Sequence, residues 1–285
     1  FLQAVARDGA LAGLAALVPR FLGLDAERGI VINELVAGGR SLQEGLGSEP
    51  AFPPTWATAL GTALGTFHRL GRNAQPALPA GLLPEQLPWI LSATGMSLVG
   101  GVPGVSGGGQ RLLSALQSFL DFAGPFARLA AGWRRETVIH GDLKWDNLLL
   151  TETPSAPTRV HLVDWELVDW GDPAWDVGSV LQAFLLTWLV GLPPGAAHDP
   201  HAMARLAPLQ PAIRAFWAAY RGAGPTVGES DFERAVTYGA ARLVHSTYEH
   251  LQFSTGLTPM AVHALQLAAH LLAAPARARR EVFGC

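Results

Sequence analysis

One stretch decides the fold of this 285-residue chain: His140-Gly141-Asp142-Leu143-Lys144-Trp145-Asp146-Asn147. Seventeen residues after Asn147, a second apolar segment ends in Asp164-Trp165-Glu166. Between residues 140 and 176 there are eight carboxylates but only two basic residues, Lys144 and Arg159. Carboxylates that gather without cations repel one another, and their hard oxygen atoms suit Mg²⁺. The stretch therefore predicts a magnesium site.

The segments that follow the stretch predict how its oxygen atoms meet. Residues 148–150 and 160–163 are short, β-prone runs that can pair as a hairpin through residues 151–158. Asn147 then lies at the start of one strand and Asp164 at the end of its antiparallel partner. Both side chains should emerge at the same end of the hairpin, and Asp142, on the loop before it, should face the same space.

The spacing of these residues also resembles a known family. His-x-Asp-Leu-Lys-x-x-Asn followed by a strand-borne aspartate is similar to the catalytic and metal-binding loops of protein kinases. The His-Gly-Asp variant and the continuation Asp164-Trp-Glu-x(5)-Asp172-Pro-Ala-Trp-Asp176 resemble aminoglycoside phosphotransferases and their choline-kinase-like relatives. The resemblance implies an α+β, protein-kinase-like fold with two lobes: a small N-terminal lobe that contains the strands and a large helical C-terminal lobe.

The same resemblance implies roles for four residues of the stretch. Asp142 would accept or orient the proton of the acceptor hydroxyl, and Lys144 would neutralise charge on the transferred phosphoryl group. Asn147 and Asp164 would ligate Mg²⁺, with ATP or GTP as the phosphoryl donor. The implied activity is transfer of the γ-phosphoryl group to a hydroxyl of a small molecule.

Two further residues would support the site. Asp176 resembles the buried aspartate that opens a long helix and braces the catalytic loop, and His140 resembles a structural pin for that loop. Glu166 would add a contact near the metal, and Trp145 would form a wall for the substrate, although core packing is the simpler interpretation of Trp145.

The resemblance extends upstream to the nucleotide-binding hinge. Residues 32–36 are similar to the strand that leads into the hinge, so the backbone of Glu34 and Val36 would hydrogen-bond adenine, and the helix at residues 55–70 would follow. The predicted division is an N-lobe remnant at residues 1–37 and a C-lobe at residues 38–285. No glycine-rich loop or strand lysine occurs in the first 37 residues, so the chain is interpreted as truncated before Phe1.

Hydrophobic periodicity predicts the remaining elements. Thr55 is expected to cap its helix, the glycines at 107–109 to lie in a long loop, and Ser230 and Glu233 to form a capping box. Thr258-Pro259 should start another helix. The expected segments are helices at 1–17, 55–70, 111–120 and 125–133, strands at 20–25, 30–36 and 137–139, a Gly/Pro-rich loop at 71–110, and helices after residue 176.

Composition excludes several other classes of protein. Hydrophobic residues make up 49% and charged residues 15%, which excludes global disorder. A net charge of −3 without a basic stripe argues against nucleic acid as a partner. The apolar run at 180–192 is shorter than a membrane span and predicts a buried helix. A single cysteine, Cys285, excludes an internal disulfide and favours the cytoplasm.

Three alternative functions remain open at this level. A pseudokinase or scaffold would keep the fold without catalysis, although retention of Asp142, Asn147 and Asp164 together argues against it. A metal-dependent hydrolase would use the same carboxylates but usually has more histidine ligands. Lys144 also makes the loop similar to that of protein kinases, so a peptide serine or threonine is an alternative acceptor. The oligomeric state is not predicted.

Overall fold

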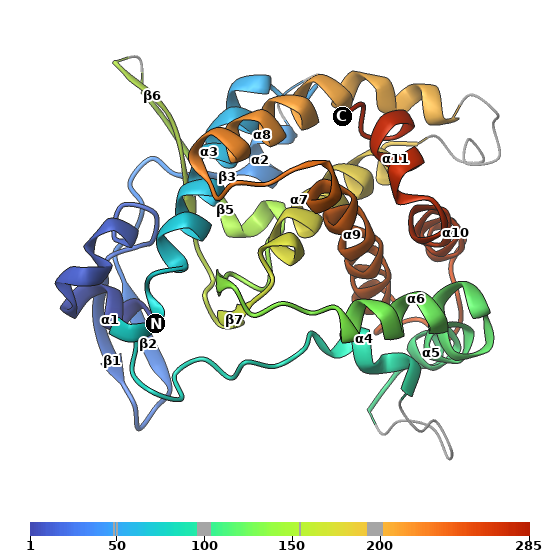
Figure 1. Ribbon diagram of the computed structural model, residues 1–285, viewed down its shortest axis with the longest axis horizontal. Coiled ribbons are helices and arrows are strands. Elements are labelled where there is room, and N and C mark those ends of the chain that lie inside the picture. Colours follow the sequence, from blue (N-terminus) through green and yellow to red (C-terminus); the bar gives the residue numbers. More distant parts are fainter. Residues whose placement is uncertain (48, 50, 96–103, 154, 193–201) are drawn as a thin grey trace. The chain divides into compact units, whose positions relative to one another are not determined.

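The described strands all lie in one part of the chain, together with several helices, and the other part is helical, so the fold is α+β (Figure 1). The computed structural model describes all residues except 48, 50, 96–103, 154 and 193–201. It contains two compact units, each assembled from three segments of the sequence.

The first unit comprises residues 1–86, 135–176 and 209–227. Three small antiparallel sheets form in it: β1 with β2, the order β3-β5-β6, and β4 with β7. Its strands are β1 (Phe21–Asp25), β2 (Ile30–Asn33), β3 (Arg40–Ser41), β4 (Thr137–Ile139), β5 (Leu148–Thr153), β6 (Ala156–Leu162) and β7 (Asp169–Gly171). Its helices are α1 (Leu2–Arg7), η1 (Gly9–Leu14), α2 (Leu42–Leu46), α3 (Pro54–Gly71), η2 (Gln75–Ala77), η4 (Trp145–Asn147) and α8 (Gln210–Ala223).

Helices α3 and α8 pack closely because α3 presents two glycines to α8. A Cβ atom on Gly61 would lie 2.2 Å from the Phe216 carbonyl oxygen, and one on Gly65 would lie 2.6 Å from that of Tyr220. Only glycine allows two backbones to approach this closely. The contact brings Tyr220 next to His68 on the last turn of α3.

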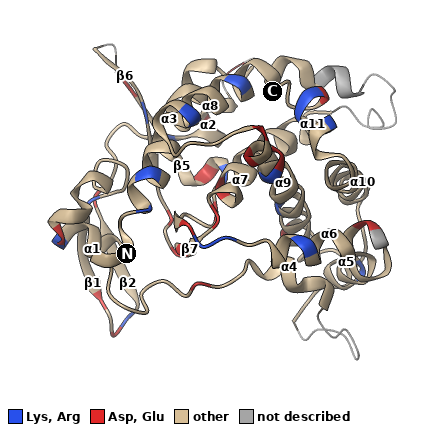
Figure 2. Ribbon diagram, in the orientation of Figure 1, with Lys and Arg blue, Asp and Glu red and all other residues tan. Residues whose placement is uncertain are grey.

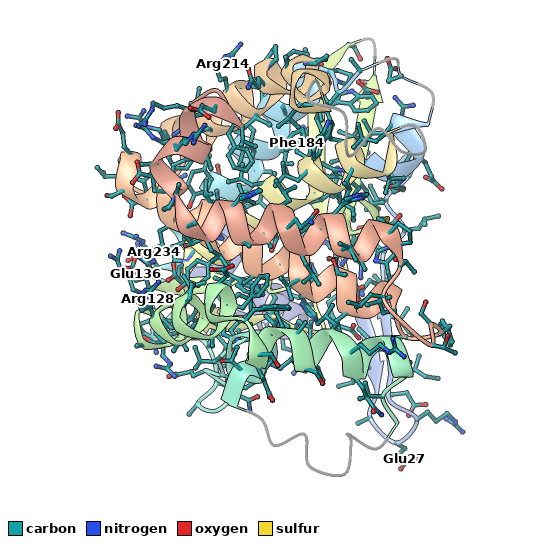
Figure 3. The ribbon with its side chains drawn as sticks, turned by 90° about the vertical axis from the view of Figure 1, so that its right-hand side faces the viewer. Glu27, Arg128, Glu136, Phe184, Arg214 and Arg234 are labelled. Atoms are coloured by element: carbon teal, nitrogen blue, oxygen red, sulfur yellow. The ribbon has the colours of Figure 1, made fainter. Side chains whose placement is uncertain are left out.

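The second unit comprises residues 87–134, 177–208 and 228–285 and is helical. Helix α9 is its longest described helix and buries thirteen residues, and Phe184 of α7 lies fully buried in the interior (Figure 3). Helix α7 starts in the first unit and continues into the second. The helices are α4 (Trp89–Ser92), η3 (Ala93–Gly95), α5 (Gly107–Ser118), α6 (Leu120–Ala131), α7 (Pro173–Val190), η6 (Ala202–Leu209), α9 (Glu229–His250), α10 (Pro259–Ala273) and α11 (Pro275–Glu281).

Helix α7 confirms that the apolar run belongs to a buried helix. It is the one described helix that is long and apolar enough to cross a membrane, but 78% of its apolar window is buried within the protein. That burial is typical of a core helix.

Most predicted elements are confirmed within a few residues, but the first helix is wrong. The expected helix at residues 1–17 is broken at Asp8, whose side chain accepts a hydrogen bond from the Ala10 amide and starts the 3₁₀ helix η1. An aspartate side chain competes with the backbone in this way and favours a new helix start over a continuous helix.

Three predicted helix starts are also wrong. Thr55 lies inside α3, where Pro53 takes the N-cap position. Ser230 lies inside α9, whose N-cap is Gly228, and the Gly228 amide donates to the Asp231 carboxylate. Residues 107–109 form the first turn of α5, because the Ser106 hydroxyl accepts from the Gly109 amide. The cap at Thr258 is confirmed. Part of the predicted Gly/Pro-rich loop, residues 96–103, lies outside the described residues.

The predicted boundary between residues 37 and 38 does not coincide with a boundary between the two compact units, because the first unit runs without interruption from residue 1 to residue 86. The assignment of residues 1–37 to an incomplete N-terminal lobe stays a prediction.

Candidate active site

The β5–β6 hairpin forms as the sequence predicts, and its end carries the first two site residues. Leu148 pairs with Leu162, and one step further the Val163 amide donates to the Asn147 carbonyl at 3.0 Å. Asp164 follows directly with a φ of 67°, a left-handed conformation that aspartate tolerates better than most residues. Asn147 and Asp164 therefore lie at the same end of the hairpin, Asn147 buried and Asp164 exposed.

Asp142 lies on the loop that precedes this hairpin. Its side chain is 7% exposed and accepts a hydrogen bond from the Lys144 ammonium group at 2.8 Å. The Asn147 side-chain Nδ2 donates to the Asp142 carbonyl oxygen at 2.9 Å. These bonds link Asp142, Lys144 and Asn147 into one cluster. Lys144 is 47% exposed, so its charge faces the solvent side of the cluster.

The backbone of the loop is shaped by Gly141. Its φ is 85°, and a Cβ atom at this position would lie 2.2 Å from the Leu167 carbonyl oxygen. Both the dihedral angle and the close approach therefore require glycine. The Gly141 carbonyl in turn accepts a hydrogen bond from the Trp175 indole at 2.9 Å.

His140 is fully buried and joins the catalytic loop to the end of the hairpin. Its Nε2 lies 2.8 Å from the Val163 carbonyl oxygen, and the Asp142 amide points at its Nδ1 at 3.4 Å. Burial lowers the pKa of His140, although Asp176 and the bond to Val163 act in the opposite direction. A neutral ring with its proton on Nε2 satisfies both contacts. His140 thus contacts both the loop and the hairpin end, and its role as a structural support stays a prediction.

Asp176 accepts from the two backbone amides at the start of the catalytic loop. The His140 amide donates to Oδ2 at 2.7 Å and the Gly141 amide to Oδ1 at 3.0 Å. Burial by itself would raise the pKa of this carboxyl, but the hydrogen bond and charge of His68, with the contribution of His140, hold the pKa below its usual value. The carboxylate is therefore the stable form in the folded protein.

His68 completes this buried network, and sequence reasoning missed it. Its Nε2 lies 3.0 Å from Asp176 Oδ2 and its Nδ1 lies 2.9 Å from the Tyr220 hydroxyl, with all three side chains buried. In the sequence alone, His68 is one of several histidines on apolar helical patterns. Its distance of 108 residues from Asp176 leaves no local signal, apart from the occurrence of a polar residue on the apolar face of α3.

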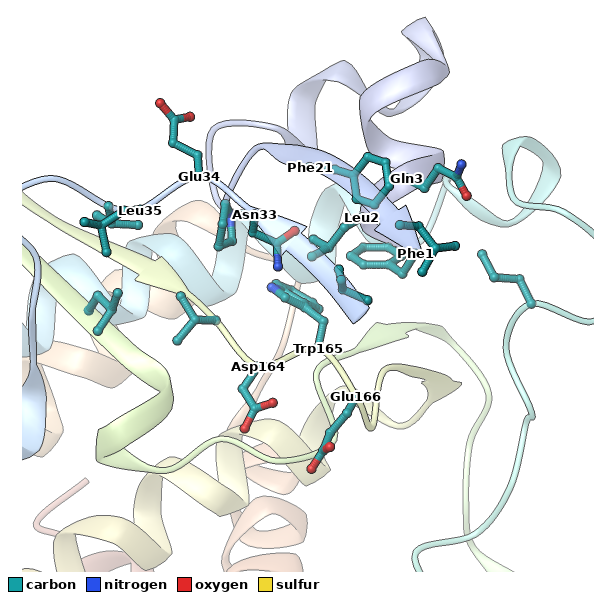
Figure 4. A pocket seen from close by; sticks show the side chains of 17 residues that line it. Phe1, Leu2, Gln3, Phe21, Asn33, Glu34, Leu35, Asp164, Trp165 and Glu166 are labelled. Atoms are coloured by element: carbon teal, nitrogen blue, oxygen red, sulfur yellow. The ribbon is translucent and has the colours of Figure 1, made fainter. Parts of the chain in front are cut away.

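A cavity of about 640 Å³ opens beside the end of the hairpin. Asp164 and Glu166 lie at one end of it, and Phe1 and Phe21 lie at the other (Figure 4). Acidic residues gather along the chain on both sides of β7 (Figure 2). Trp145, in contrast, is 5% exposed and packs on Phe52 with ring centroids 5.2 Å apart, so it belongs to the core and forms no substrate wall.

Glu34 and Val36 also line the cavity, on the segment that leaves β2. The Glu34 amide donates to the Arg20 carbonyl and the Val36 carbonyl accepts from the Gly39 amide. In the described backbone, no hydrogen bond uses the Glu34 carbonyl or the Val36 amide. The Glu34 carboxylate points away from Asp164 (Figure 4) and pairs with Arg20 at 3.0 Å.

The oxygen atoms at the hairpin end fit a magnesium ion. Because Nδ2 of Asn147 is held by the Asp142 carbonyl, its Oδ1 is the atom that could ligate a cation beside the Asp164 carboxylate. Among the described residues no group of three or more His, Cys, Asp and Glu side chains could hold a metal by themselves. One amide and one carboxylate match Mg²⁺ that takes its remaining ligands from phosphates and water.

Residues 1–216 match the APH phosphotransferase enzyme family. The chain belongs to this family. The match includes every site residue named above except Tyr220, and it agrees with the resemblance that the catalytic loop indicated. No curated protein sequence matches this phosphotransferase.

Three of the solved structures with a similar fold illustrate the likeness. Choline kinase LicA from Streptococcus pneumoniae has a TM-score of 0.53 and 17% identity, covering 96% of this chain and 81% of that one. A choline/ethanolamine kinase family protein from Mesorhizobium loti has a TM-score of 0.53 and 17% identity, and the match covers 99% of this chain and 82% of that one. An aminoglycoside phosphotransferase from Alicyclobacillus acidocaldarius has a TM-score of 0.51 and 17% identity, and the match covers 100% of this chain and 82% of that one. These likenesses confirm the protein-kinase-like α+β fold and leave the acceptor of this phosphotransferase open.

Proposed function

We propose that this phosphotransferase moves the γ-phosphoryl group of ATP or GTP to a hydroxyl of a small molecule in a Mg²⁺-dependent reaction. The observation that carries the proposal is the clustering of Asp142, Asn147 and Asp164 at one end of a hairpin that borders a cavity of about 640 Å³. The cavity is large enough for a mononucleotide-sized ligand.

Each residue has a role that follows from its contacts. Asp142 orients the acceptor hydroxyl and takes its proton as the new P–O bond forms and the bond to the leaving nucleoside diphosphate breaks. Lys144 fixes Asp142 Oδ2 and adds positive charge where negative charge develops. Asn147 and Asp164 hold Mg²⁺, which neutralises phosphate charge when bound. The backbone of Glu34 and Val36 binds the base.

The buried network keeps this arrangement in place. His140 and Asp176 hold the backbone of residues 140–142, so the Asp142 carboxylate does not have to be ordered during the reaction. A small alcohol, such as an amino alcohol, a sugar or an aminoglycoside, is the proposed acceptor class. We infer a cytoplasmic location from the single cysteine, which cell fractionation can test.

Acceptor screening with the full-length natural chain tests the proposal. MgATP and MgGTP are supplied with choline, ethanolamine, aminoglycosides, sugars and a serine peptide, and phosphorylated products are measured by mass spectrometry. Asp142→Asn serves as the inactive control. A phosphorylated small alcohol supports the proposal, and nucleotide binding without any transfer indicates a pseudokinase. Free phosphate formed without an acceptor indicates a hydrolase, and a phosphopeptide indicates a protein kinase.

A further inference from the structure

Residues 78–86 form a loop that contributes Leu82 to the wall of the 640 Å³ cavity. Leu82 also lines a smaller cavity of about 420 Å³, together with Pro79 of the same loop. The Leu82 side chain is half-buried, and its position depends on what holds the loop.

Two consecutive amides of this loop are held by one carboxylate. The Glu85 amide donates to Asp169 Oδ1 at 2.6 Å, and the Gln86 amide donates to Asp169 Oδ2 at 2.9 Å. Hydrogen bonds from backbone amides to a carboxylate are stronger than those between neutral groups. Asp169 therefore holds the backbone of the loop at two consecutive residues.

Arg135 holds the same loop through the backbone carbonyl group of Glu85. Its Nε and one terminal nitrogen both donate to the Glu85 carbonyl, at 3.2 and 2.9 Å. Glu85 has a φ of 57°, a conformation that is unfavourable for a residue with a side chain. Such a conformation persists where surrounding contacts impose it, and here Asp169 and Arg135 supply those contacts.

The two anchoring residues lie in or next to the small sheet that leads into the catalytic loop. Asp169 is the first residue of β7 and pairs with Ile139 of β4, which is followed directly by His140. Arg135 lies two residues before β4. The loop that carries Leu82 is thus fastened to the same strands that position Asp142.

We propose that Asp169 and Arg135 are positioning residues that fix Leu82 as a wall of the nucleotide cavity and thereby set nucleotide affinity. This inference rests on the proposed function, since it takes the cavity as the nucleotide site. Asp169 and Arg135 touch no reacting atom, so they should change nucleotide affinity and leave the chemical step unaltered.

The proposal is tested by measuring MgATP affinity by calorimetric titration and kcat by steady-state kinetics. The variants are Leu82→Ala, Asp169→Asn, Arg135→Gln and the double variant Leu82→Ala/Asp169→Asn. Each single variant should weaken MgATP binding by about 3- to 10-fold, the effect of losing part of one leucine contact, while kcat stays within about twofold. The double variant should bind no more weakly than Leu82→Ala, because the anchor acts through Leu82. Arg72→Gln is the matched control: it breaks an ion pair with Glu136 beside the same sheet, and it should bind MgATP like the wild type.

The outcomes separate the two proposals. A wild-type protein that binds no MgATP overturns the proposed function. If the wild type binds MgATP and Asp169→Asn and Arg135→Gln bind it equally well, the positioning role is wrong. Additive losses in the double variant show that the anchor does not act through Leu82. If Asp169→Asn fails to fold in a urea-unfolding control, Arg135→Gln, whose ion pair with Glu85 is about half exposed, decides the test.

Discussion

Two regions of the first unit contribute to the candidate site but are stabilised in different ways. Around the catalytic loop, the side chains of His140, Asp176 and His68 are fully buried, and each is hydrogen-bonded within the protein. In the β1–β2 hairpin, all four residues of β2 are exposed, and Glu27 at its tip projects into solvent (Figure 3). Its ion pair between Arg20 and Glu34 is 50% or more exposed on both sides.

This difference indicates where the protein keeps a fixed geometry. A buried polar group has no water to replace a lost partner, so the network around Asp176 strongly favours one arrangement. An exposed hairpin loses little when a surface contact is removed, because water substitutes for it. The proposed chemistry depends on the catalytic loop. The base of the nucleotide is proposed to contact the backbone that follows the β1–β2 hairpin. Five predictions test the comparison.

The largest effect is expected at Asp142. Asp142→Asn should lower kcat by about 10²–10⁴-fold, because a positioned proton acceptor is lost, with little change in nucleotide affinity. Turnover measured under saturating MgATP checks this. Asp146→Asn, an exposed neighbour on the same loop, is the control and should be near wild type. Undiminished turnover of Asp142→Asn would remove its catalytic role.

Breaking the buried network should strongly destabilise the fold. His68→Ala removes the side chain that bonds Asp176 and is expected to lower the free energy of unfolding by about 3 kcal/mol, measured by urea denaturation. His161→Ala is the control, since the ring of this half-buried histidine of β6 makes one hydrogen bond within the described structure, to the Thr151 hydroxyl, and its loss should cost about 1 kcal/mol or less. Equal losses in the two variants would contradict the special importance of the network.

The metal site is tested by Asp164→Asn. The variant keeps the size of the side chain and tolerates the left-handed φ, but it removes a charge that would face Mg²⁺. Binding of Mg-nucleotide should weaken by about tenfold or more, while binding of nucleotide without metal changes less. Calorimetric titrations with and without Mg²⁺ measure both. Equal losses would mean that Asp164 is structural.

A pH dependence should follow from His140. Burial holds its pKa below the ordinary value in the folded protein, so the unfolded chain binds a proton more readily. Stability should therefore be fully present above about pH 6.5 and decrease as the pH falls below that value, by at most about 1.4 kcal/mol per pH unit for one proton. Urea denaturation from pH 8 to pH 5 measures the slope. His140→Gln should reduce the slope, and an unchanged slope would assign it to other groups.

The smallest effect is expected in the hairpin. Glu34→Gln removes the exposed ion pair with Arg20 but leaves the backbone of residue 34 in place. Stability and nucleotide affinity should both stay within experimental error of the wild type. A clear loss of nucleotide affinity would show that the Glu34 side chain, and not only its backbone, contacts the nucleotide.

Much of the candidate site could be predicted because its signals are local. The spacing of Asp142 and Asn147 lies within one loop, and the hairpin that brings Asn147 to Asp164 follows from two β-prone runs separated by a short connection. The helix starts were less predictable, because several residues near Thr55, Gly107 and Ser230 could serve as caps, and the choice depends on which carbonyls and amides the fold leaves to be satisfied.

The sequence by itself determined the fold class, the family and the residues that carry the proposed chemistry, because these depend on residue type and on separations of a few residues. Only the tertiary structure decided that His68 bonds Asp176 across 108 residues, that Asp169 holds the loop at Glu85 and Gln86 across more than 80, and that Trp145 is buried. Such pairs leave no periodic trace in the sequence. They form because packing α3 against α8 and pairing β4 with β7 bring together residues that are distant in the sequence, and His68 and Asp176 meet where water cannot satisfy their polar groups.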